Sequence, residues 1–322
     1  MRVVSMFAAI CAACFAAAPA RAQTWPSGPI KMVVPYAAGG ATDAFARLIA
    51  GKLQDQMNTP VIVDDKAGAG GNLGANFVAK SPPDGYTVLF NINGQAISPA
   101  LYKSLPYDAD NDFLRVTQLV STTSVLVVVP SLPVKTFQEL IAYAKANPGK
   151  LNYGSTGVGN SLHLTMEMIK HATGTDIQMV PFRGDAPLFS AMLGGEVQLA
   201  VVPMVTAMAH IESGALRALA VSTAKRAGPL PDVPTVAEQG LPGFEMQGWM
   251  GLFVPAKTPR AIVERLWKES RTALAAPDVA PVMKNLALDP VGSSPEEFDK
   301  RYFADRAMIQ QVVKDANIPL QD

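Results

Sequence analysis

Four loops of this sequence carry glycines or short polar side chains at positions that start a predicted helix or end a predicted strand. They span residues 36–42, 68–72, 155–161 and 182–185. Free N–H groups at a helix start, with the helix dipole behind them, stabilise a negative group. Gly39 and Gly40 would let the backbone approach a ligand closely or adopt a positive φ. These loops predict capture of an anion by backbone and hydroxyl donors.

Side chains in the same loops support this chemistry, with one exception. Arg183 offers a planar fork suited to a carboxylate. Asp43 would repel an anionic ligand, so it either caps the following helix and points away or accepts a hydrogen bond from an amine or water. The sequence leaves both roles of Asp43 open. Short neutral donors stand in the third loop, at Ser155, Thr156, Asn160 and Ser161.

The motifs for nucleotide binding and for serine hydrolysis lack residues that they require at fixed positions. In the glycine runs that begin at Gly68 and Gly157, leucine replaces the last glycine of the dinucleotide fingerprint, and no Walker lysine follows a glycine loop. Around Ser155 a nucleophile elbow would need glycine two residues earlier, where Tyr153 stands. Neither nucleotide binding nor acyl hydrolysis is supported.

One helical face carries His163, Glu167 and His171 and could suggest zinc. Eight residues of α-helix span about 12 Å, so the two histidines cannot both reach one ion at ~2 Å. A simpler interpretation pairs Glu167 with a histidine on a solvated face. We therefore predict no metal site, no catalytic residues and no cofactor.

Apolar strand-like runs alternate with helix-like segments along the chain, which is typical of α/β architecture with mainly parallel sheets. The pattern predicts helices alone after residue 255, over 259–275, 280–286 and 295–317. One domain would comprise residues 23–123 and 250–322, and a second, inserted domain residues 124–249. Crossing segments near 121–130 and 245–255 would form the hinge, with the ligand cleft between the domains.

The first residues have the three parts of a secretory signal peptide, with cleavage expected after Ala22. Cleavage would remove both cysteines, Cys11 and Cys14, so the mature chain could form no disulfide. The sequence shows no basic stripe, which argues against nucleic acid and anionic membrane surfaces. We expect an exported, monomeric protein.

Several motifs resemble the Bug receptors, the extracytoplasmic solute-binding proteins of tripartite tricarboxylate transporters. Residues 34–43 (VPYAAGGATD) resemble the family's first ligand loop. The resemblance covers essentially the whole mature chain in family order. Further matching motifs are GAGGNLG at 68–74, PDGYT at 83–87, PALY at 99–102, LNYGS at 151–155 and LPDVPTVAE at 230–238.

The resemblance implies a two-domain fold of the periplasmic-binding-protein kind that closes on a small organic acid and passes it to membrane transporter subunits. One carboxylate would be held by the first loop, largely through backbone groups and water. On the family pattern and strand-end position, the expected ligand-binding residues are Tyr36, Ala38, Gly39, Gly40, Asp43, Asn93, Ser155, Thr156, Asn160, Ser161, Phe182, Arg183, Gly184 and Met204.

Two departures from the family pattern bear on the ligand. Phe182 lacks the hydroxyl of the usual tyrosine, and Ala191 stands where aspartate is common. A more apolar pocket with one fewer carboxylate favours an aromatic or longer aliphatic dicarboxylate over an amino acid. Two alternatives stay open, an exported enzyme that acts on a small carboxylic acid and a ligand-sensing module for a membrane kinase.

Overall fold

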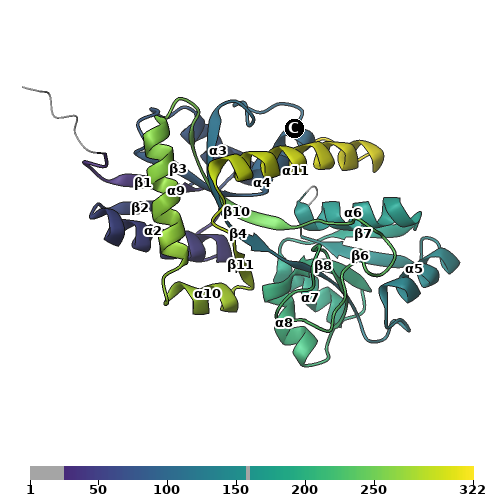
Figure 1. Cartoon of the computed structure of the whole chain (residues 1–322). Coiled ribbons are helices and arrows are strands. Elements are labelled where there is room, and N and C mark those ends of the chain that lie inside the picture. Colours follow the sequence, from purple (N-terminus) through teal and green to yellow (C-terminus); the bar gives the residue numbers. More distant parts are fainter. Residues whose placement is uncertain (1–24, 157–159) are drawn as a thin grey trace, which may run out of the picture.

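A computed structural model describes residues 25–156 and 160–322 of the chain. The molecule has two lobes, each built on one β-sheet flanked by helices (Figure 1). The α/β, two-sheet fold predicted from the sequence is confirmed. The signal-peptide prediction for residues 1–22 lies outside the described residues.

The first sheet has the strand order β11-β4-β10-β3-β1-β2. β1 pairs in parallel with β2 and β3, whereas β10 pairs antiparallel with β3 and β4, and β11 antiparallel with β4. This sheet is therefore mixed rather than mainly parallel. Its strands are β1 (Ile30–Val34), β2 (Val61–Asp65), β3 (Thr87–Ile92), β4 (Phe113–Thr122), β10 (Gly248–Pro255) and β11 (Leu288–Pro290).

Helices of the first lobe cover this sheet with apolar faces. In α2 the residues Phe45, Ile49 and Leu53 recur at helical spacing and are almost fully buried. The short 3₁₀ turn η1 (Ala69–Gly71) precedes α3. The α-helices are α2 (Ala41–Met57), α3 (Asn72–Ala79), α4 (Gly94–Leu101), α9 (Arg260–Leu274), α10 (Val279–Asn285) and α11 (Pro295–Asp315).

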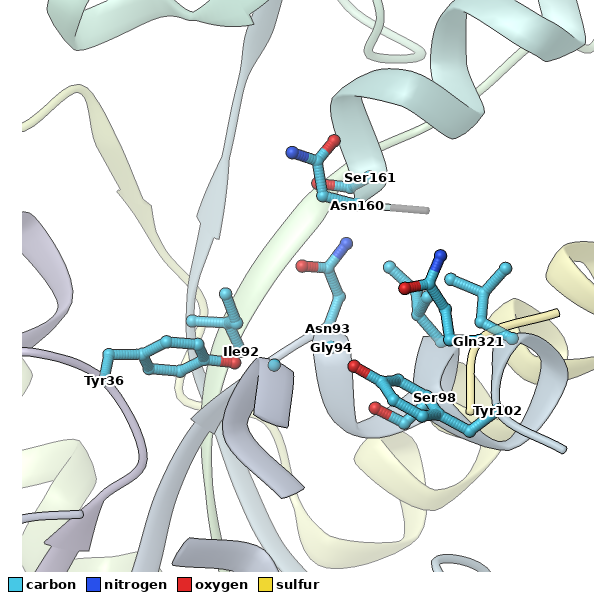
Figure 2. Close-up of a pocket in the computed structure, with 12 residues that line it drawn as sticks. Tyr36, Ile92, Asn93, Gly94, Ser98, Tyr102, Asn160, Ser161 and Gln321 are labelled. Atoms are coloured by element: carbon cyan, nitrogen blue, oxygen red, sulfur yellow. The ribbon is translucent and has the colours of Figure 1, made fainter. Parts of the chain in front are cut away.

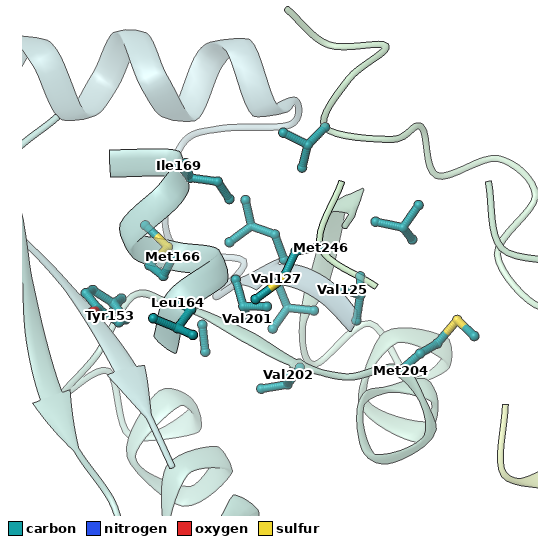
Figure 3. Close-up of a cluster of buried hydrophobic side chains, with 14 of the residues drawn as sticks. Val125, Val127, Tyr153, Leu164, Met166, Ile169, Val201, Val202, Met204 and Met246 are labelled. Atoms are coloured by element: carbon teal, nitrogen blue, oxygen red, sulfur yellow. The ribbon is translucent and has the colours of Figure 1, made fainter. Parts of the chain in front are cut away.

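The second sheet has the order β7-β6-β8-β5-β9 and is also mixed, because β5 pairs antiparallel with β8 and β9. Its core gathers side chains from the sheet and from α6, including Val127, Val201, Leu164 and Met166 (Figure 3). The elements of this lobe are β5 (Ser124–Val128), α5 (Phe137–Ala146), β6 (Leu151–Ser155), α6 (Ser161–Thr173), β7 (Ile177–Pro181), α7 (Asp185–Leu193), β8 (Leu199–Pro203), α8 (Met204–Glu212) and β9 (Arg217–Val221).

Two segments connect the lobes. Thr123 alone separates β4 of the first sheet from β5 of the second, and the chain returns from β9 to β10. These crossings agree with the predicted hinge segments, but the exact boundaries at 123/124 and 249/250 stay a prediction. Helix α11 also packs against α6 of the second lobe (Figure 1). No helix in the ranges that the structure describes is long and apolar enough to cross a bilayer.

Two details of the sequence prediction are wrong. The segment after residue 255 contains strand β11 as well as helices, because β11 is a three-residue edge strand too short to show alternation. Ser155, predicted to begin the third loop, is the last residue of strand β6.

Candidate functional site

A cleft between the lobes contains two adjoining cavities, of about 220 and 280 Å³. Both are lined by Asn93 from the first lobe and by Asn160 and Ser161 from the second, so they are two arms of one space. We call the smaller cavity the Tyr102 arm, which continues along Ser98, Tyr102 and Gln321. The larger is the Trp249 arm, which continues along Thr42, Thr123, Pro203, Met204, Trp249 and Met250.

Four helices begin at this cleft. The first residue of α2 (Ala41), of α6 (Ser161) and of α8 (Met204) lines the Trp249 arm, while Gly94, the first residue of α4, lines the Tyr102 arm. The first N–H groups of each helix have no partner within that helix, although the Met204 N–H donates to Thr123 O and the His163 N–H donates to Asn160 Oδ1. Among the described residues, no charged side chain lines either arm. The cleft therefore presents positive helix ends and neutral side chains, which suit an anion.

The first loop contributes Tyr36, Ala41 and Thr42 to the cleft. The Tyr36 hydroxyl donates to Asn91 Oδ1 at 3.0 Å, and burial raises the pKa of this phenol, so it stays protonated. Ala38, Gly39 and Gly40 are exposed and belong to neither lining. Gly39 has a φ of 84°, as predicted for these glycines, whereas Gly40 has an ordinary φ of −78°.

Asp43 holds this loop together. Gly40 is the N-cap of α2, so Asp43 does not cap the helix; its carboxylate accepts the Gly39 N–H at 2.7 Å and pairs with Arg47 Nε at 2.7 Å. Arg47 also pairs with Asp65 at 2.5 Å. Burial raises the pKa of Asp43, but the hydrogen bond from Gly39 and the Arg47 guanidinium lower it by more than burial raises it. The pKa of Asp43 therefore lies below its usual value.

In the second lobe, Asn160 and Ser161, which were predicted to bind the ligand, line both arms, and Figure 2 shows them at the Tyr102 arm. Asn160 is also the N-cap of α6, where its Oδ1 accepts the His163 N–H at 2.9 Å and its Nδ2 donates to Thr156 Oγ1 at 3.1 Å. Ser155 is buried at the end of β6, and neither Ser155 nor Thr156 lines a cavity. Residues 157–159 of the predicted loop lie outside the described residues.

The turn at 182–184 stands apart from both arms. Phe182 packs against the core of the second lobe, and Arg183 is exposed. Gly184 is the N-cap of α7 and has a φ of 106°. Their contact with a ligand stays a prediction, whereas the structure places Asn93 in both linings and Met204 in the Trp249 arm.

The predicted pair of Glu167 with a histidine forms on helix α6, because Glu167 Oε1 lies 3.8 Å from His163 Nε2, but this face is not solvated. Glu167 accepts hydrogen bonds from the Tyr153 hydroxyl at 2.6 Å and from Lys170 Nζ at 2.7 Å. His163 is buried and stacks on Tyr153, while His171 is exposed and faces away. His163 is therefore buried beside Tyr153 and Glu167 rather than exposed to solvent. Within residues 25–156 and 160–322, no group of three or more His, Cys, Asp or Glu side chains could hold a metal ion.

Sequence reasoning missed several cleft residues. Ser98 lies on α4 and Tyr102 is its C-cap; this helix was not predicted because Pro99 lies inside it. The motif at 99–102 was noted only as a family resemblance. Trp249 lies on the crossing strand β10, and Gln321 lies beyond α11. No local pattern marks Gln321, because its place in the cleft arises from tertiary packing alone.

Comparisons with known proteins agree with this architecture. Residues 45–318 match the tripartite tricarboxylate transporter family receptor. The structure of Rpa4515 from R. palustris with adipate is 35% identical, with a TM-score of 0.80 over 92% of this chain and 100% of that one. The periplasmic binding protein BugD is 32% identical, with a TM-score of 0.77 over 92% and 100%. MatC from Rhodopseudomonas palustris with bound malate is 30% identical, with a TM-score of 0.76 over 90% and 100%.

The family match covers most of the chain, and the similar structures span nearly all of it at 30% identity or more. The resemblance to Bug-type receptors is thereby confirmed, and with it the prediction that the chain is not an enzyme. This chain belongs to the tripartite tricarboxylate transporter receptor family, whose members are substrate-binding receptors for small carboxylates.

Proposed function

We propose that this protein is a periplasmic receptor that captures a small dicarboxylate in the cleft between its lobes and delivers it to a membrane transporter. The observation that carries the proposal is the meeting of four helix N-termini, at Ala41, Gly94, Ser161 and Met204, around a cleft without charged side chains. The absence of charged side chains refers to the residues that the structure describes. Neutral donors and helix dipoles favour a carboxylate over a cation and need no buried countercharge.

The walls of the cleft favour an acid with an apolar body. Ile92, Leu162, Met204, Trp249 and Met250 line the Trp249 arm beside the helix ends. Such a surface suits a methylene chain or a ring more than the ammonium group of an amino acid. Adipate and malate, the ligands of the two similar proteins, are both dicarboxylates. We therefore infer that a longer aliphatic or an aromatic dicarboxylate is the ligand.

Several finer assignments belong to the same proposal. The mature receptor is a monomer released by cleavage after Ala22, with domains 23–123 plus 250–322 and 124–249. Closure of these domains would bring the more distant predicted contacts nearer to the ligand. Arg183 and the exposed glycines of the first loop are such contacts.

A screen of the mature protein tests the function. Linear dicarboxylates of four to eight carbons, matched monocarboxylates, a benzene dicarboxylate, citrate and glutamate are added, and thermal unfolding is followed. A ligand at 100 times its dissociation constant adds about 2.7 kcal/mol to the stability. We expect a dicarboxylate to give the largest shift, with its affinity then measured by calorimetry.

Two outcomes would contradict the proposal. One is the absence of any shift with every acid, and the other is a larger shift with glutamate than with each dicarboxylate. Mass spectrometry of the recovered ligand separates a receptor, which returns the acid unchanged, from an enzyme, which changes its mass. Uptake of the labelled acid into transporter-containing vesicles, with and without the receptor, separates transport from sensing.

A further inference from the structure

The Tyr102 arm contains buried polar side chains that the fold does not use. Asn93 is 6% exposed and Ser98 5% exposed, yet within the described ranges neither side chain has a hydrogen-bond partner. The Tyr102 hydroxyl and the Gln321 amide also lack a partner in the part of the chain that the structure describes. All four line the same cavity (Figure 2). Asn93 and Ser98 are buried residues whose polar atoms open onto this cavity, whereas Tyr102 and Gln321 are half-buried. All four polar groups are therefore placed to meet a ligand or its water in the cavity.

Gln321 is held at the cavity by the backbone. Its N–H donates to Leu101 O at 2.7 Å, and its carbonyl accepts the Lys103 N–H at 3.0 Å. These two bonds form a parallel bridge around Tyr102, and an ion pair between Lys103 and Asp322 supports it. The segment after α11 is thus fixed as one wall of the Tyr102 arm.

The chemistry of this arm suits a carboxylate. Hydroxyls of Ser98 and Tyr102 and the amides of Asn93 and Gln321 can all donate hydrogen bonds. The N-terminus of α4 at Gly94 adds a positive helix end. No carboxylate side chain lines the arm among the described residues, so nothing there would favour an ammonium group.

We propose that the Tyr102 arm is a subsite for the second carboxylate of the ligand, with Ser98, Tyr102 and Gln321 as its donors. The first carboxylate lies in the Trp249 arm, at the N-termini of α2 and α8, and the shared residues Asn93 and Asn160 lie between the two. The segment after α11 thereby takes part in setting the length of acid that the receptor accepts. The subsite rests on the proposed function, because it assumes that a dicarboxylate binds in the cleft.

The test compares pairs of ligands in single variants. Tyr102→Phe and Ser98→Ala each remove one donor and little volume, and Gln321→Ala removes the whole amide. Calorimetry measures the dissociation constants of the best linear dicarboxylate, of its half-amide and of the monocarboxylate of equal length. We expect each variant to weaken the dicarboxylate roughly tenfold, as for loss of a hydrogen bond to a charged group. The monocarboxylate should change less than twofold, because it leaves the arm empty.

Matched control variants lie away from the cleft. Gln311→Ala removes an exposed amide on α11 that bonds to Asp315, and Tyr143→Phe removes a hydroxyl on α5. Both should bind all three ligands as the wild type does. Thermal unfolding of every variant without ligand confirms that each is folded.

The outcomes separate the subsite from the function. If the variants weaken dicarboxylate and monocarboxylate equally, or neither, the second-carboxylate subsite is wrong while the receptor function stands. If the half-amide binds as tightly as the diacid and responds equally to the variants, the arm does not select a carboxylate. If no linear acid of either kind binds to the wild type, the proposed function fails and the subsite fails with it.

Discussion

Some residues of the first loop line the ligand cleft, and others stabilise the loop itself. Tyr36 and Thr42 line the cleft, whereas Asp43 accepts the Gly39 N–H and pairs with Arg47 beneath the loop. The Gly39 N–H is therefore already used within the protein and is not free for a ligand. Asp43 is a positioning residue, because it fixes the turn that precedes α2 and lines neither arm.

Asp43→Asn should destabilise the protein at neutral pH and have less effect in acid. The pKa of Asp43 lies below its unfolded value of about 3.9, so its contribution is complete above that pH and is lost as the pH falls through the folded pKa. The loss at pH 7 should be about 1 kcal/mol, since half-exposed Arg47 adds little charge energy. Urea unfolding at pH 7 and pH 2.5 measures the difference.

The control for this prediction is Asp55→Asn on the exposed face of α2, which should follow the wild type at both pH values. The same pH series also reports on Asp65. Burial, and then the charge of Asp43, raise the pKa of Asp65, so the Asp43→Asn variant should partly relieve that effect. An equal loss at pH 7 and pH 2.5 would show that the charge of Asp43 has no role.

Elements of the fold differ in how far the sequence could predict them. Strand β1 is buried and apolar except at Lys31, strand β5 is buried and apolar after Ser124, and α2 has a clear apolar face, so pattern alone found them. Strand β11 and helix α8 are short, and α8 begins directly after Pro203 without a side-chain cap. Such elements are stabilised by tertiary contacts and leave no local pattern.

The candidate site shows the same limit. Residues that follow strands or begin helices, such as Asn93, Asn160 and Ser161, were predicted to bind the ligand and do line the cleft, while their contact with a ligand stays a prediction. Ser98 lies on a helix whose internal proline hid it, and Gln321 reaches the cleft only because a backbone bridge ties it to residue 102. Long-range pairing of this kind cannot be read from a single sequence.

Asn160→Ala should affect both stability and binding, because Asn160 serves helix α6 and the cleft together. Loss of the N-cap bond to His163 N–H should cost about 1 kcal/mol, and Asn160→Ser should restore most of it. Urea unfolding without ligand measures the stability, and calorimetry measures the affinity for the best dicarboxylate.

Thr136→Ala is the matched control, since Thr136 caps α5 far from the cleft through a bond to Glu139 N–H of 3.1 Å. It should lose a similar stability and keep the wild-type affinity. If Asn160→Ala also keeps the affinity, Asn160 serves only the helix and its predicted ligand contact is wrong.

At the scale of the whole molecule, one side chain, Trp249, links the ligand cleft to the crossing strand β10 and to helix α11. Trp249 lies on β10, the strand by which the chain returns to the first sheet, and it lines the Trp249 arm. Its Nε1 donates to Asp305 Oδ2 on α11 at 2.8 Å, and α11 packs against α6 of the second lobe. A ligand that enters the cleft therefore meets the crossing strand and the helix that bridges the lobes.

The fluorescence of Trp249 should report this coupling. We expect the best dicarboxylate to change the intrinsic tryptophan emission of the wild type, because Trp249 contacts the space that the ligand fills and the lobes move around its strand. In Trp249→Phe the change should disappear, although calorimetry still detects binding. Trp267→Phe, on α9 and outside both arms, should keep the full change. A signal that survives in Trp249→Phe and is lost in Trp267→Phe would place the ligand-linked movement elsewhere, in the first lobe rather than at the crossing strand.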